Sequence, residues 1–340
     1  MLKLTTLAAT MLLSTRAVIA AEADFTLTPP PPPSVNDQAV LVIPIADQSV
    51  LLSNADKSIS INKHRVYDMW RTVMSAGQVE KAPQFFAADL KQHNPVIATG
   101  LAAYQKWLTP QLKRKAEVPA KIAEPLISMV AEGNFVGMAF VTSYPEPDGS
   151  GKTYTSTHFY LFRLEKEKIA EMWESVQIPK GVLPPTVDAP LPVRGIQKLA
   201  QLPLLASHDP ELANNKRTVF DLWRQIPEAG REELADLYLD ETYIQHNPNA
   251  TTGRAGFKEY MAKRPDAPIE SWINRPVVAY VAEGNIVMQV LEEVRPDPNH
   301  PGTEYKVAWF DMFRLSHGKL IEHWDAAAKG ELPAVMQQAK

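Results

Sequence analysis

The stretch of sequence that decides the fold occurs twice in this chain. Asn62–Arg71 reads NKHRVYDMWR, and Asn215–Arg224 reads NKRTVFDLWR, 153 residues further on. The motif QHNP follows at the same offset, beginning at Gln92 and at Gln245, and the motif VAEGN occurs twice with an offset of 151 residues. Because the order is preserved over a unit of roughly 130 residues, the pattern indicates a duplicated domain and not a solenoid of short repeats.

Prolines mark the boundaries of the two copies. Six prolines lie between residues 179 and 204, where they cannot continue helices or central strands, so 179–204 is predicted to be a linker. The first domain is then expected at residues 47–178 and the second at 205–330. The run Pro29–Pro33 favours an extended polyproline II conformation, and residues 21–46 are expected to form a flexible segment.

Composition excludes several classes of protein. The chain has 340 residues, of which 45% are hydrophobic and 22% are charged, and neither a wholly disordered chain nor a multi-span membrane protein has this composition. The net charge is −4 and no basic run could neutralise a string of phosphates, so no nucleic-acid partner is expected. The chain has no cysteine, which excludes disulfides and a lipid-modified N-terminal cysteine.

Residues 1–20 are predicted to be a secretory signal peptide. Lys3 precedes the apolar stretch Leu4–Leu13, and small residues follow at plausible cleavage positions. The alternative is a buried N-terminal helix, which Arg16 favours because it interrupts the apolar region. The stretch is too short for a membrane span. The mature protein is therefore expected to be periplasmic or secreted.

Each copy is expected to place helices before a run of strands. In the second copy, Asp209 and Pro210 form an N-terminal cap for a long helix, and a third helix is predicted at Gly253–Lys263. β-branched and aromatic residues then predict strands at residues 277–282, 285–295, 305–315 and 320–325. This order predicts an α+β fold, with helices packed on a curved antiparallel sheet and a pocket beneath the helices.

The last two predicted strands place the candidate chemistry. A three-residue loop, Ser316-His317-Gly318, would put Gly318 in the left-handed region. Asp311 would then lie opposite His323, on the face that also carries Trp309, Phe313 and Asp325. A two-residue loop would instead turn His323 to the other face.

An acid beside an imidazole among apolar residues is a candidate acid/base pair. Desolvation would raise the pKa of Asp311, whereas an adjacent imidazolium at His323 would lower it. The alternative is a structural ion pair or an exposed edge. His246, in the QHNP motif, is either a pocket residue or a turn-stabilising hydrogen-bonder. His246, His323 and Asp325 could ligate iron or zinc, yet they form no compact ligand motif, so no metal or other cofactor is predicted.

Five stretches of the second copy together resemble the SnoaL-like polyketide cyclase family, and most closely its branch of predicted aldol-condensation-catalysing proteins. They are Tyr243–Pro248, Gly253–Tyr260, Val281–Asn285, Phe310–Arg314 and Glu322–Asp325. The resemblance covers nearly all of residues 208–330 and, more weakly, 55–178. It implies two nuclear-transport-factor-2-like, or cystatin-like, domains and cofactor-free acid/base chemistry on a carbonyl compound. The implied catalytic residues are Asp311, His323, His246 and Asp325, and the expected substrate-binding residues are Trp309, Phe313, Gln289 and Tyr243.

Both copies depart from this family. The middle strand of the second copy has Val287–Val290 where relatives often carry His. In the first copy Tyr160, Met172 and Glu174 stand where Asp311, His323 and Asp325 stand in the second. A first domain with a degenerate site is expected, although His158 and Glu174 could form a relocated pair.

Three functions follow as hypotheses. The second domain is an acid/base enzyme of the aldol cyclase, isomerase or lyase type acting on a small carbonyl compound, or the chain is a non-catalytic binding protein for a small hydrophobic ligand. The third hypothesis is that the duplication serves assembly. The two copies would form an intramolecular pseudo-dimer through an apolar face comprising Phe310, Met312, Leu320 and Trp324.

Overall fold

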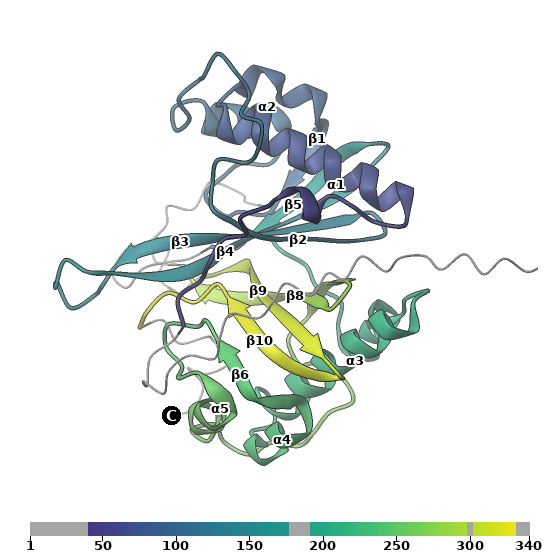
Figure 1. The fold of residues 1–340 in the computed structure, drawn as a ribbon, viewed down its shortest axis with the longest axis vertical. Coiled ribbons are helices and arrows are strands. Elements are labelled where there is room, and N and C mark those ends of the chain that lie inside the picture. The colour runs from purple at the N-terminus through teal and green to yellow at the C-terminus, as the bar shows by residue number, and fades with distance from the viewer. Residues whose placement is uncertain (1–39, 177–190, 298–301, 331–340) are drawn as a thin grey trace, which may run out of the picture.

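The computed structural model describes residues 40–176, 191–297 and 302–330, and the predicted signal peptide lies outside them. Two α+β units follow one another along the chain, each with a five-stranded sheet (Figure 1). The sheets lie toward the middle of the molecule, and the helices cover their outer faces (Figure 1). The predicted fold class is therefore confirmed. No helix of the described residues has the length and apolarity needed to cross a membrane.

The first unit runs from residue 40 to residue 176. Its helices are η1 (Ser49–Leu51), α1 (Lys57–Met69), the π-helix η2 (Trp70–Ser75), η3 (Val79–Gln84) and α2 (Leu101–Leu108). Its strands are β1 (Phe86–Gln92), β2 (Leu126–Glu132), β3 (Phe135–Pro145), β4 (Thr153–Glu165) and β5 (Lys168–Glu174). The strand order is β1-β5-β4-β3-β2.

The second unit, which begins at residue 191, repeats this arrangement. Its helices are η4 (Lys198–Leu205), α3 (Pro210–Gln225), η5 (Glu232–Leu234), α4 (Ala235–Tyr238) and α5 (Gly253–Met261). Its strands are β6 (Leu239–Gln245), β7 (Val277–Glu283), β8 (Ile286–Pro296), β9 (Glu304–Ser316) and β10 (Lys319–Asp325), in the order β6-β10-β9-β8-β7. The predicted cap of α3 is present, since the Asp209 side chain accepts a hydrogen bond from the Glu211 N–H at 2.8 Å.

Each sheet is antiparallel except at one edge. β1 lies parallel to β5 and β6 lies parallel to β10, so the predicted wholly antiparallel sheet needs correction. The long connection from β6 back to β10 permits this parallel pairing. One result is that Gln245, at the end of β6, lies beside His323 of β10.

The hairpin between β9 and β10 differs from the predicted one. The loop has two residues, His317 and Gly318, both with positive φ (50° and 75°), as a type I′ turn requires. Lys319 pairs with Ser316 and Leu320 with Leu315, and this register alone would turn His323 away from Asp311. The register then shifts between Leu320 and Glu322, so that Ile321 is the extra residue of a β-bulge.

The bulge restores the predicted face by another route. Beyond it Asp325, and not His323, lies directly opposite Asp311, and His323 pairs with Phe313. His323 and Asp311 therefore still share a face, although the predicted register was wrong. Leu320, which precedes the bulge, belongs to the core beneath the helices and not to the opposite apolar face as predicted.

A third buried cluster contains residues from both sheets. Phe310, Met312 and Trp324 lie in it as predicted for that face, together with residues of β4 such as Phe159. The rings of Phe159 and Phe310 stack across the two units, with centroids 5.5 Å apart and planes 3° from parallel. The Lys63 ammonium also lies 2.7 Å from Glu283, and Lys216 lies 2.7 Å from Glu132.

An extended segment leads into each unit and is packed against the molecule. Val42 and Val193 are both buried in the cluster between the sheets. The Ile45 N–H donates to the carbonyl of Leu126, and Ile196 makes the equivalent bond to Val277. The described parts of the segments predicted as flexible (21–46) and as a linker (179–204) are thus ordered by contacts, while the domain boundaries themselves stay predictions.

Candidate functional site

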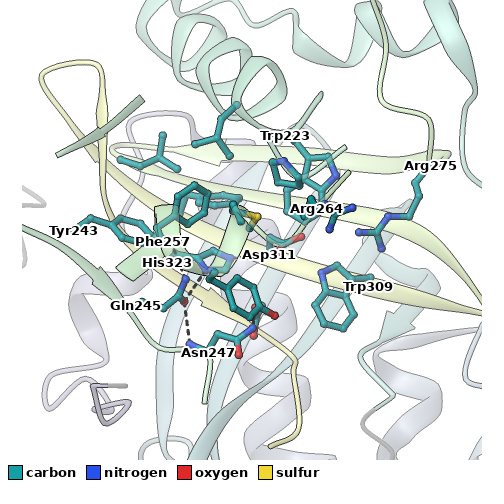
Figure 2. A pocket seen from close by; sticks show the side chains of 17 residues that line it. Trp223, Tyr243, Gln245, Asn247, Phe257, Arg264, Arg275, Trp309, Asp311 and His323 are labelled. Atoms are coloured by element: carbon teal, nitrogen blue, oxygen red, sulfur yellow. Dashed lines mark hydrogen bonds and ion pairs between the residues drawn. The ribbon is translucent and has the colours of Figure 1, made fainter. Parts of the chain in front are cut away.

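A cavity of about 50 Å³ lies beneath the helices of the second unit (Figure 2). One ordered water requires only about 10–15 Å³ by the same kind of measure, so the cavity has room for a small compound. Six predicted site residues line it: Asp311, His323, Asp325, Trp309, Phe313 and Tyr243. They come from β6, β9 and β10, which the parallel and antiparallel pairings bring side by side.

Asp311 and His323 form a buried pair in the wall of this cavity. The Nε2 atom of His323 lies 3.1 Å from Oδ1 of Asp311, and these residues are only 7% and 1% exposed. Gln245 determines the protonation of the other ring nitrogen of His323. Its Oε1 accepts the backbone N–H of Asn247 at 2.9 Å, so this atom is the amide oxygen. The same oxygen lies 2.9 Å from Nδ1 of His323, which must therefore carry a proton.

The consequence is that Asp311 and His323 share one proton. If His323 is neutral, its Nε2 accepts a hydrogen bond and Asp311 must be protonated; otherwise the pair is a carboxylate beside an imidazolium. Both states place one proton between Oδ1 and Nε2. In both states the pair has no net charge, so the proton can move between Oδ1 and Nε2 without adding a net charge to the apolar wall.

Asp325 is the second carboxyl group of the site. Burial raises its pKa to about 6, the charge of His323 opposes this rise, and the neighbouring Asp311 adds to it. The Ala327 N–H donates to its Oδ1 at 3.1 Å, and the Asn247 side chain donates to its Oδ2 at 2.5 Å. Asp325 therefore titrates nearer to neutral pH than an ordinary aspartate.

Two predicted substrate-binding residues act differently from each other. Tyr243 lines the cavity and accepts a hydrogen bond from Nε2 of Gln245 at 3.2 Å, and burial raises the pKa of its hydroxyl well above the usual value. Gln289 is not among the lining residues of the described chain. It lies behind the site, where its Nε2 donates to Oδ2 of Asp311 at 3.4 Å and its Oε1 accepts from the Tyr280 hydroxyl.

His246 does not join the cavity, contrary to the prediction. Its Nε2 lies 2.8 Å from Glu322, its Nδ1 lies 2.9 Å from the carbonyl of Val40, and its ring stacks on Trp324. The reason is the alternation of the extended chain, since Gln245 and Asn247 point into the site and the residue between them points away.

The first unit repeats this outward-facing environment. His93 contacts Glu171 at 2.8 Å and the carbonyl of Pro192 at 3.1 Å, and it stacks on Trp173. A histidine held in the same way in both copies matches the hydrogen-bonding alternative. Because His246 points away from the cavity, it does not face the site together with His323 and Asp325, the metal ligands considered with it.

A different set of three residues has the spacing of metal ligands. Asp311, His323 and Asp325 each offer one ligand atom, and these atoms lie within 4.8 Å of one another. Because Nδ1 of His323 is bonded to Gln245, a metal ion would have to use Nε2 and break the bond to Asp311. The set is compatible with a divalent cation but has a competing hydrogen-bonded state.

Aromatic rings fill the corresponding space in the first unit. Trp70 stacks on Phe140 at a centroid distance of 4.5 Å and meets Tyr160 edge-on at 4.7 Å. His158 and Glu174 do form the relocated pair, at 2.9 Å, and the Tyr160 hydroxyl donates to the same carboxylate at 2.8 Å. Tyr160 is thus directly opposite Glu174, and His158 is diagonal to it.

Sequence reasoning missed the cationic side of the cavity. Arg264 and Arg275 line it together with Trp223 and Tyr260 (Figure 2). They lie after α5 and before β7, in segments with no periodic pattern of their own. The signal that could have found Arg275 is the repeat, because the equivalent position of the first copy is Glu124.

Comparison with known families gives one match, to the SnoaL-like domain over residues 65–172. The chain therefore contains a SnoaL-like domain, and this match falls in the first unit. Comparison with curated proteins gave no match.

Solved structures of similar proteins each cover about a third of the chain. A SnoaL-like polyketide cyclase from Agrobacterium tumefaciens is 13% identical, covering 34% of this chain and 89% of its own, with a TM-score of 0.24. A protein with a cystatin-like fold from Xanthomonas campestris is 17% identical, covering 33% and 88%, with a TM-score of 0.25. TsrD from Streptomyces laurentii is 14% identical, covering 36% and 90%, with a TM-score of 0.23. At TM-scores this low we draw no conclusion from these likenesses.

Proposed function

We propose that the second unit is a cofactor-free acid/base catalyst for a small carbonyl compound, of the aldol cyclase, isomerase or lyase type. One observation carries the proposal: a buried Asp311–His323 pair shares a single proton in the wall of a largely apolar cavity. Proton transfer next to a carbonyl group needs a base and a hydrogen-bond donor together, and this pair supplies both.

In the proposed step, Asp311 as carboxylate removes the proton from the carbon beside the carbonyl. The C–H bond breaks, an O–H bond forms on Asp311, and the electron pair moves to the carbonyl oxygen. The Nε2–H of the His323 imidazolium donates a hydrogen bond to that developing enolate oxygen. Gln245 holds the ring through Nδ1, and the charge of Asp325 stabilises the imidazolium.

The test is exchange of the proton beside the carbonyl in deuterium oxide, followed by NMR with a panel of small ketones, β-keto esters and enones. Exchange that depends on the protein should fall by a factor of about 100 or more in Asp311→Asn and in His323→Gln, the usual range for a general acid or base. A chelator in one arm tests whether Asp311, His323 and Asp325 act through a metal ion instead.

The first unit offers a matched control. Tyr160→Phe changes the position equivalent to Asp311 and should leave the exchange rate unchanged. Exchange that persists in folded Asp311→Asn would contradict the assigned base. Loss of exchange in Tyr160→Phe would indicate that the chemistry takes place in the first unit, which contradicts the proposal.

A non-catalytic ligand-binding protein is the second candidate. The observation that favours it is the apolar part of the lining, which includes Leu222, Phe257, Met261, Phe313 and Leu320. A protein that binds a panel compound without exchanging its protons would support this function. Co-purified small molecules would then identify the ligand.

Two further proposals concern the whole chain. We propose that it is exported after removal of residues 1–20, which mass spectrometry of the mature protein in a cell-envelope fraction would test. We also propose that the two units form an intramolecular pseudo-dimer, supported by the shared apolar cluster and by the two ion pairs between the units.

A further inference from the structure

One side of the cavity has buried hydrogen-bond donors without acceptors. Among the residues that the structure describes, six such atoms belong to lining side chains: Nε1 of Trp223, Nε1 of Trp309, the hydroxyl of Tyr260, and Nε, Nη1 and Nη2 of Arg275. Five of the six can only donate. Because buried donors are normally paired, these atoms indicate that an acceptor belongs between them.

The same side carries two positive charges. The Arg275 guanidinium lies 5.3 Å from the centre of the Trp223 ring, and Arg264 lines the cavity beside it (Figure 2). Burial lowers the pKa of Arg264 to about 10, and the charge of Arg275 lowers it further. Two adjacent, half-buried cations favour an anion between them.

Burial raises the pKa of the nearby Glu228 carboxylate, and the charges of Arg275 and Arg264 oppose that rise. Glu228 accepts the backbone N–H groups of Asn274 at 2.6 Å and of Arg275 at 3.2 Å, one on each oxygen. No carboxylate within the described residues forms an ion pair with the Arg275 guanidinium. Glu228 therefore offsets part of the positive charge, while the donors of the Arg275 guanidinium are left for an anion from outside the protein.

The first unit shows what such an acceptor does. Trp70 occupies the position of Trp223, and its Nε1–H donates to the carboxylate of Glu124 at 2.9 Å. Glu124 stands two residues before β2, just as Arg275 stands two residues before β7. The second unit thus lacks the carboxylate that pairs with the tryptophan and carries a guanidinium in its place.

We propose that the Arg264–Arg275 side of the cavity binds a carboxylate group of the ligand, so that the ligand is a keto acid. The ligand carboxylate would accept from Arg275 and from the indole N–H groups, as Glu124 does in the first unit. The carboxylate site stands on its own observations, whereas the keto group rests on the proposed function.

The strand spacing gives the length of such a ligand. Trp309 and Asp311 are two residues apart on one face of β9, which corresponds to roughly 7 Å. A carboxylate near Trp309 and a reacting carbon near Asp311 would therefore be separated by several carbon atoms. Longer keto acids such as 6-oxoheptanoate fit this spacing better than 2-oxo acids.

The test compares acids with their esters. Binding of hexanoate, 6-oxoheptanoate and their methyl esters to the full-length protein would be measured by calorimetry and by ligand-observed NMR. The carboxylates should bind about tenfold or more tightly than the esters, the effect of one charge-assisted pair. The preference should weaken as the salt concentration rises.

Variants then separate the possible results. Arg275→Glu recreates the first unit's pairing with tryptophan, so it should fold and lose the preference, whereas Arg217→Gln removes an exposed charge on α3 and should keep it. Equal binding of acids and esters, no binding of any carboxylate, or a preference that survives in folded Arg275→Glu would overturn the carboxylate site. Asp311→Asn should retain carboxylate binding, so a failure of the acid/base proposal is distinguishable from a failure of this one.

Discussion

At the scale of single residues, Asp325 shows how burial turns a common side chain into a group that titrates near neutral pH. It is 4% exposed and lies opposite Asp311, so ionising it places two negative charges in one small volume. Asn247 and the Ala327 N–H compensate only part of this cost. The protonation of Asp325 is therefore coupled to folding.

This coupling predicts a pH dependence of stability. The pKa of Asp325 is about 6 in the folded protein, whereas its ordinary value of 3.8 applies to the unfolded chain. Between these two pH values the folded state holds a proton that the unfolded state has lost. The free energy of unfolding should fall as pH rises through this window, and the loss should be complete above the folded pKa. Asp325→Asn removes the part of this pH dependence that comes from the titration of Asp325.

The measurement is urea unfolding of both proteins from pH 4 to pH 7.5. The stability of Asp325→Asn relative to the natural protein should rise across the window by up to about 3 kcal/mol, at about 1.4 kcal/mol per pH unit. A constant effect of the substitution cancels in this comparison. Parallel stability curves would show that Asp325 titrates normally.

At the scale of elements, the β4–β5 and β9–β10 hairpins use the same turn with different residues. The loop before β10 is His317-Gly318, whereas the loop before β5 is Lys166-Glu167, with φ of 49° and 60°. Positive φ costs an ordinary L-residue about 1–2 kcal/mol, and glycine avoids this cost. The first unit therefore contains a strained turn at Glu167.

Exchanging the two residues tests this account. Glu167→Gly should stabilise the protein by about 1 kcal/mol, and Gly318→Glu should destabilise it by a similar amount. A Cβ at Gly318 would meet no atom within 4 Å, so the second effect is one of backbone conformation alone. Both values come from chemical denaturation. Two changes of the same sign would refute the explanation.

At the scale of the whole molecule, two reciprocal ion pairs join the units. Lys63 of α1 contacts Glu283 of β7, and Lys216 of α3 contacts Glu132 of β2, with both ammonium groups buried. Each carboxylate also accepts a backbone N–H from the opposite unit, at 2.8 Å from Ala131 and at 2.9 Å from Ala282. The two pairs therefore lie close together, where β2 of the first unit meets β7 of the second.

Removing either lysine should destabilise the protein strongly. Lys63→Met and Lys216→Met each leave a largely buried carboxylate without its cation, at a cost of about 3 kcal/mol, the low end for broken buried pairs because the carboxylates keep some exposure. Lys63→Met combined with Glu283→Gln should cost less than the sum of the single changes. Chemical denaturation measures the free energy of unfolding of the natural protein, the three single variants and the double variant. A loss of less than about 0.5 kcal/mol in the free energy of unfolding, as for exposed pairs, would argue against a stabilising role of these two ion pairs.

The sequence by itself determined the duplication, the α+β class and the face of β9 that carries the site. These features depend on local regularities: a repeat needs no coordinates, and side chains two apart on a strand share a face because of covalent geometry. For that reason Trp309, Asp311 and Phe313 were placed together correctly. The same alternation, applied to QHNP, would have placed His246 away from Gln245 and Asn247.

Only the tertiary structure decided how these faces meet. The bulge at Ile321 depends on β10 pairing with β9 and β6 at once, and no local pattern distinguishes it from the three-residue loop that was predicted. Arg264 and Arg275 reach the cavity because separate segments pack around it. Register and convergence arise from contacts between residues distant in sequence, so they become visible only when the chain is folded.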